Sequence, residues 1–176
     1  MRGKGIIMND SHNPSVHHAA AAEHHQQAAR FHREAARHYQ IGKDYAHAAH
    51  QALTAHGHAL RALEHGQAAS ARYAAHEGSP LPGYLSRASN KPTSTSLAFP
   101  ITLNGTDHHA VAADHHAAAG LHHEKAGEHS AAEHYVRAKH ATNEAVKHTE
   151  HALFHADQAA MHHMEHYGSH PSAELA

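Results

Sequence analysis

The chain contains no cysteine and no tryptophan, and it has three phenylalanines among its 176 residues. The absence of cysteine excludes disulfides, thiolate metal sites and a cysteine nucleophile. The scarcity of large apolar side chains predicts a thin core, because hydrophobic stabilisation scales at about 25 cal/mol per Å² of buried apolar area. Alanine is the most frequent residue, and alanine has the highest helix propensity of all residues. The composition therefore predicts closely packed helices.

Neither charge sign dominates the chain, and it has no long apolar run. Lys and Arg contribute 14 positive charges against 16 from Asp and Glu, so we expect no nucleic-acid partner. No segment approaches the roughly 18 apolar residues of a membrane span, and we expect no membrane contact. The N-terminus lacks the apolar core of a secretion signal, which predicts a cytoplasmic protein, or a periplasmic one only if that terminus is engineered. Residues 1–12 are expected to form a disordered leader and residues 169–176 a disordered tail.

Histidine is unusually abundant, and its positions recur with a helical period. The chain has 29 histidines. In one stretch the doublets His108-His109, His115-His116 and His122-His123 follow each other every seven residues. Imidazole is the commonest protein ligand for zinc, copper and nickel. A histidine face repeated along several helices therefore predicts a metal-binding surface.

The chain is an internal duplication. The segment 13–25 (NPSVHHAAAAEHH) matches 104–116 (NGTDHHAVAADHH). His50, His58, His65 and His76 match His140, His148, His155 and His166 at a constant offset. We expect two equivalent units, at residues 13–78 and 105–168. Between them, residues 79–104 are rich in Pro, Ser and Thr, which predicts a linker.

Each unit is predicted to be an α-helical hairpin. In the first, Asn13 is the expected N-cap with Pro14 at the first helical position, and Gly42 ends the helix. Its second helix is expected from about Asp44 to His76. In the second unit, Asn104, Thr106 or Asp107 caps a helix that ends near Gly127, and its partner runs from about Glu128 to Tyr167. The predicted fold is all-α: two antiparallel helical hairpins packed as a four-helix bundle.

Each long second helix carries two faces. On residues 44–76, His58 and His65 lie on one side, and Leu53 and Leu60 lie opposite. We expect the Ala/Leu face to form the interior, because many desolvated imidazoles are costly unless each finds a partner. Met161 and Met164 are assigned to the core on the same argument.

Residues three or four apart on a helix are neighbours, which decides which histidines can share an ion. The residues 148–166 satisfy that spacing best, so we expect the tightest binding there, and a larger loss from replacing His151 and His155 than from replacing His58 and His65. The candidate metal ligands are His25, His32, His47, His50, His58, His65, His115, His122, His148, His151, His155, His162 and His166.

Known enzyme motifs are missing from the sequence. It has no HExxH motif, no Gly-rich phosphate loop and no repeated Glu-x-x-His set of a di-iron bundle. Catalytic metal sites use three protein ligands that a supporting shell fixes, whereas this chain offers a surplus of donors. We therefore expect a binding protein and not an enzyme.

Glu144-Ala-Val-Lys-His148, with His140 before it and His155 after it, resembles the repeating unit of the bacterial small metal-binding protein family. Residues 17–78 also resemble a group of uncharacterised His-rich bacterial proteins with the patterns Arg33-Glu-Ala-Ala-Arg37 and Ala55-His-Gly-His58. Here the unit is present as a tandem duplication. The resemblance implies multi-site binding of copper, nickel and zinc on a helical bundle.

The predicted function is buffering or sequestration of divalent transition metals (copper, nickel or zinc), with metal ions as partners and a homodimer as a further expectation. The alternative is a structural or pH-responsive interaction protein with histidine-lined helix interfaces, since histidine titrates near pH 6.5.

Overall fold

The computed structural model describes residues 13–42, 44–77 and 103–168, and for residues 74–77 and 166–168 it describes the backbone alone. The described residues form four α-helices: α1 (Pro14–Ile41), α2 (Tyr45–Glu77), α3 (Gly105–Ala131) and α4 (Tyr135–Gly168). The all-α four-helix prediction is confirmed. The expected leader, residues 79–102 of the expected linker, and the expected tail lie outside the described residues.

The predicted caps of the first hairpin are present. The Asn13 side chain accepts a hydrogen bond from the Ser15 N–H at 3.0 Å, and Pro14 opens α1. Gly42 ends α1 with φ 72° and donates its N–H to the Tyr39 carbonyl. A left-handed φ of this size favours glycine.

The second hairpin begins with a capping box. Asn104 and Asp107 exchange side-chain to backbone hydrogen bonds of 3.0 and 3.2 Å at the start of α3. The predicted end of this helix near Gly127 is wrong, because α3 continues to Ala131. Gly127 lies inside the helix against α1, where an added Cβ would stand 3.4 Å from the His18 Cβ. This glycine therefore allows close packing of two helices and does not mark a turn.

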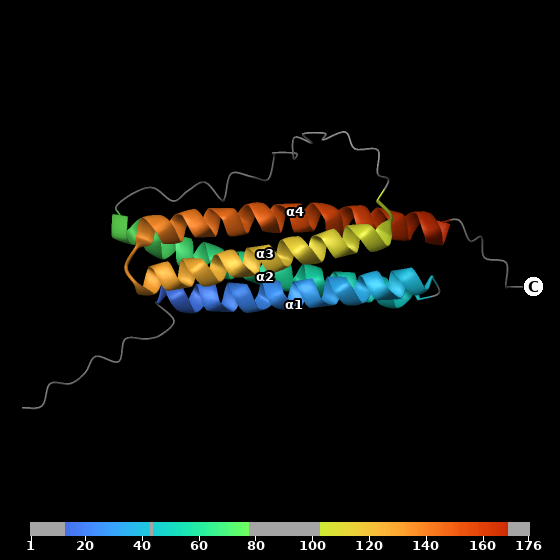
Figure 1. Cartoon of the computed structure of the whole chain (residues 1–176), viewed down its shortest axis with the longest axis horizontal. Helices are drawn as coiled ribbons and strands as arrows, with labels where there is room; N and C mark the ends of the chain where they lie inside the picture. Colours follow the sequence, from blue (N-terminus) through green and yellow to red (C-terminus); the bar gives the residue numbers. More distant parts are fainter. Residues whose placement is uncertain (1–12, 43, 78–102, 169–176) are drawn as a thin grey trace, which may run out of the picture.

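The helices pack as two antiparallel hairpins, α1 with α2 and α3 with α4 (Figure 1). The hairpins meet chiefly through α1 and α3, which also run antiparallel, while α2 and α4 touch less extensively. None of the helices in the described part of the chain is both long and apolar enough to cross a membrane.

Alanine and histidine line the interior, and the expected leucine and methionine core is wrong. Ala28, Ala55 and Ala119 are fully buried. In contrast, Leu53 is 71% exposed and Met164 is 66% exposed; Leu60 and Met161 are also exposed. The small alanine side chains let the helices approach closely, and imidazoles fill the remaining seam. Their desolvation is tolerated because the rings pair with one another across helices.

Candidate metal-binding interfaces

Each histidine doublet of α1 and α3 is divided between two interfaces. Neighbouring residues on an α-helix point about 100° apart, because 3.6 residues make one turn. The first member of a doublet, such as His24 or His115, faces the other helix of its own hairpin. The second member, such as His25 or His116, faces the opposite hairpin. The seven-residue repeat thus builds two seams at once.

The seam between α1 and α3 contains six imidazoles, which we call the central His column. It consists of His18, His25 and His32 from α1 and His109, His116 and His123 from α3. Three cross-helix pairs have facing Nδ1 atoms: His18 with His123 at 3.1 Å, His25 with His116 at 3.3 Å and His32 with His109 at 3.3 Å.

Stacking joins successive pairs of the column. The rings of His25 and His123 lie 5.4 Å apart with an interplanar angle of 14°, and those of His32 and His116 lie 5.4 Å apart at 13°. The column is therefore a continuous run of alternating hydrogen-bonded and stacked rings along the bundle.

Burial keeps the column neutral. Desolvation, followed by the fields of neighbouring imidazoles, lowers the pKa of five of its histidines to about 3 and that of His123 to about 4. At neutral pH each ring therefore carries one proton on its two nitrogens. In each facing pair one Nδ1–H donates and the other Nδ1 accepts.

The Nε2 atoms of the central His column differ in their hydrogen-bond partners. The Nε2 of His18 meets the Tyr73 hydroxyl, and the Nε2 of His25 lies 3.2 Å from the Thr149 hydroxyl. The Nε2 of His109 lies 3.0 Å from the Nε2 of His163. By contrast, the buried Nε2 atoms of His32 and His116 make no hydrogen bond within the described part of the chain. A buried nitrogen without a partner is costly, and it retains full donor or ligand capacity.

The seam within the first hairpin holds four half-buried imidazoles, the hairpin-1 cluster: His17, His24, His58 and His65. The Nδ1 atoms of His17 and His65 lie 3.3 Å apart, and those of His24 and His58 lie 3.1 Å apart. The rings of His24 and His65 stack at 5.6 Å. At the next heptad position of α1 stands Phe31, which stacks on His58.

The seam within the second hairpin is richer, and we call it the hairpin-2 cluster. Its members are His108, His115, His122, His148, His151, His155 and His162. The Nδ1 atoms of His108 and His155 lie 2.9 Å apart, and those of His115 and His148 lie 3.1 Å apart. Partial burial is the main cause that lowers the pKa of His108, His115 and His155. His108 is buried at 8% exposure, His151 is exposed, and the other five rings of this cluster are half-buried, whereas all six rings of the central column are buried.

Ten of the thirteen predicted ligands lie in the three seams. His115, His122, His148, His151, His155 and His162 belong to the hairpin-2 cluster, His58 and His65 to the hairpin-1 cluster, and His25 and His32 to the central column. His47 bonds to Asp44 and stacks on His38, and His50 is exposed. For His166 the structure describes the backbone alone.

Sequence reasoning missed the residues that pair across helices: His17, His18, His24, His108, His109, His116, His123 and His163. Spacing along one helix selects neighbours on that helix, whereas most of the close pairs join two helices. The repeated doublets were the available indication, since a polar pair every seven residues fits a helix–helix seam.

The facing nitrogens have a separation that suits metal ligands. Two imidazole nitrogens bound to one tetrahedral zinc ion at about 2.0–2.1 Å lie roughly 3.3 Å apart. The cross-helix pairs have separations of 2.9–3.3 Å. Within the described residues, however, no group of three or more His, Asp or Glu side chains already has the arrangement of a metal site. The pairs offer two ligands each, and further ligands require rings to turn.

Comparison with known proteins found no matching family model, no similar curated protein and no similar solved structure.

Proposed function

We propose that this protein binds several divalent transition-metal ions at its helix seams and thereby buffers or sequesters them. The observation that supports this proposal is the set of histidine pairs between the two helices of each hairpin, whose facing nitrogens lie 2.9–3.3 Å apart. Copper, nickel and zinc are the expected ions, because imidazole suits all three, and copper binds tightest in the Irving–Williams order.

The protonation of the seams supports the same proposal. Metal and proton compete for an imidazole nitrogen. Burial lowers the pKa of His24, His58 and His65 in the first hairpin, and of His115 and His155 in the second. Rings with lowered pKa values are neutral at physiological pH and free to bind an ion without first losing a proton.

Binding capacity, and not catalysis, fits this distribution of donors. Catalytic metal sites use a few ligands that surrounding groups hold in place and an open coordination position. Here the donors form rows of similar pairs along the seams within the two hairpins. A row of similar pairs suits the uptake of several ions, so we propose a non-enzymatic role.

The test is a metal analysis of protein purified without a nickel column. The stripped full-length chain is titrated with Cu²⁺, Ni²⁺ and Zn²⁺ by calorimetry at about pH 7.5, and the loaded protein is measured by elemental analysis. We expect more than one ion per chain. A stoichiometry below one ion per chain at micromolar metal would contradict the proposal.

The central His column supports a second candidate, a structural role in which histidine seams respond to pH. Its six rings are buried and neutral, and their protonation would place charge inside the bundle. This role predicts that helicity and oligomeric state change between about pH 7.5 and 5.5 with a chelator present, while added metal changes neither. A metal-induced change in the same measurement favours the first proposal instead.

A further inference from the structure

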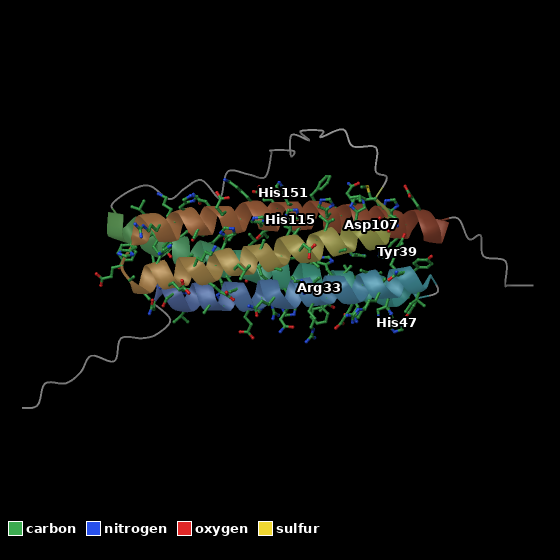
Figure 2. The ribbon with its side chains drawn as sticks, in the orientation of Figure 1. Arg33, Tyr39, His47, Asp107, His115 and His151 are labelled. Carbon is green, nitrogen blue, oxygen red and sulfur yellow. The ribbon has the colours of Figure 1, made fainter. Side chains whose placement is uncertain are left out.

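His115 is surrounded by three imidazoles from the facing helix. Its Nδ1 lies 3.1 Å from that of His148. Its ring centre lies 5.4 Å from that of His148, 5.1 Å from that of His151 and 6.0 Å from that of His155. Figure 2 labels His115 on α3 and His151 on α4 at the same level of the bundle. In this region four imidazoles from two helices converge.

The separations of these rings are those of shared ligands. Two imidazoles on one tetrahedral ion, each with a metal–nitrogen bond of about 2.0–2.1 Å, have ring centres roughly 5 Å apart. The three partners of His115 lie 5.1–6.0 Å from it, with interplanar angles of 38°, 65° and 12°. As they stand, these rings do not have the arrangement of a metal site, so binding one ion requires their side-chain torsions to change. Along α4, His151 is a helical neighbour of both His148 and His155, three and four residues away. His148 and His155 are seven residues apart and are brought together only through His115 on the facing helix.

The cluster is open to an incoming ion. His151 is exposed, and His115, His148 and His155 are half-buried. The crowding also acts on His115, since its pKa is lowered first by burial and then by the fields of His151, His148 and His155.

The first hairpin has the same pattern with one replacement. His24, His58 and His65 occupy the positions that correspond to His115, His148 and His155 in the duplicated sequence. At the position that corresponds to His151 stands Arg61. A guanidinium stays protonated and cannot bind a metal ion. The positive field of Arg61 also reaches this site: it lowers the pKa of His58 after burial, and that of His24 after burial and the field of His58.

We propose that the second hairpin holds one high-affinity site for a divalent transition metal, made by His115, His148, His151 and His155, and that Arg61 prevents the first hairpin from forming its equivalent. This proposal rests on the proposed function and adds an asymmetry to it: one tight site per chain above a background of weaker pairs.

A loss-of-site comparison tests the proposal on the stripped full-length chain. Zn²⁺ affinity is measured against a competing chelator, and Co²⁺ is used as a probe whose visible spectrum reports tetrahedral nitrogen coordination. His115→Ala is expected to weaken the tightest Zn²⁺ site by at least the roughly 10–100-fold that loss of a supporting group alone costs. His24→Ala is the matched control, since His24 has the corresponding position and the same 3.1 Å pairing distance. It is expected to leave the tightest site unchanged.

A gain-of-site comparison uses exposed positions, where neither replacement disturbs packing. Arg61→His is expected to raise the number of tight Zn²⁺ sites from one to two, and His151→Arg is expected to abolish the tight site. Equal effects of His115→Ala and His24→Ala, or no added site in Arg61→His, would overturn the proposal while the wild-type chain still binds several ions. A wild-type chain that binds no Zn²⁺ tightly would contradict both this proposal and the proposed function.

Discussion

His115 and His116 are neighbours in the sequence, yet they lie in different interfaces. His115 is half-buried and faces α4, whereas His116 is fully buried and faces α1. Burial lowers the pKa of both residues, and for His116 it lowers the pKa to about 3. In the other doublets of α1 and α3 the two members likewise face different helices, although in His108-His109 both are buried. One repeated dipeptide thus supplies both an accessible seam of ligands and an inaccessible seam that joins the duplicated halves.

The largest expected effect is that of acid on the inaccessible seam, the central His column, which is expected to lose its contribution to stability as the pH falls. The central histidines have folded-state pKa values of about 3 to 4 and titrate near 6.5 when unfolded. Protonation therefore favours the unfolded chain, and their contribution to stability is complete above pH 6.5 and declines as the pH falls toward 3. At one pH unit below 6.5 each such residue costs on the order of 1 kcal/mol, so the column as a whole costs on the order of several kcal/mol.

A loss of that size is comparable to the whole stability of a typical domain, about 5–15 kcal/mol. We expect the urea midpoint of the metal-free protein to fall steeply between about pH 7.5 and 5.5, with loss of helical circular dichroism near the lower value. A midpoint that does not change over this range would mean that the column is not desolvated.

Replacing His115 or His116 by alanine, one at a time, measures at neutral pH how much each seam contributes to stability. His116→Ala leaves a cavity and removes the partner of the buried His25 Nδ1, which should cost about 2–4 kcal/mol. His115→Ala, in the half-exposed seam, should cost below about 1 kcal/mol. Urea denaturation with a chelator present gives both values. If the two substitutions cost the same, the division of the doublets between seams is wrong.

Two glycines of α2 provide the smallest contrast. An added Cβ at Gly57 meets nothing within 4 Å, whereas at Gly66 it would stand 3.2 Å from the His123 ring. Gly57→Ala should therefore stabilise the protein by about 0.5–1 kcal/mol through helix propensity alone. Gly66→Ala should lose that gain, because His123 is held by His18 and cannot withdraw freely. Thermal unfolding of the two variants compares them directly. Equal stabilisation would show that the His123 ring can move aside at little cost in free energy.

The local structure was largely predictable from the sequence. Asn13, Pro14 and Gly42 act through rules that involve only a few neighbouring residues, and the structure places them as expected. Asn104 follows the same rules. The duplication also correctly gave two similar hairpins.

Which histidines are buried could not be predicted from the sequence pattern of each helix alone. Treating each imidazole alone makes its burial costly, so Leu53 and Leu60 were assigned to the interior and are exposed instead. The partner that offsets the desolvation of His25 is His116, far away in the sequence. Gly127 was misread for the same reason, since its role depends on α1 and not on its own helix.

The assignment of ligands along a single helix stays a prediction. The larger effect expected from replacing His151 and His155 than from replacing His58 and His65 now has a structural basis in the difference between His151 and Arg61.

The most direct test of the division between seams is imidazole ¹⁵N NMR of the stripped full-length protein at about pH 7.5 during titration with Zn²⁺. Nitrogen shifts distinguish neutral, protonated and metal-bound rings. We predict that His115, His148 and His155 change to metal-bound shifts at the first equivalent, while His25 and His116 keep the shifts of neutral, hydrogen-bonded rings. Simultaneous changes at His25 and His116, or their protonation in the metal-free protein at this pH, would contradict the division of the histidine doublets between a ligand seam and a structural seam.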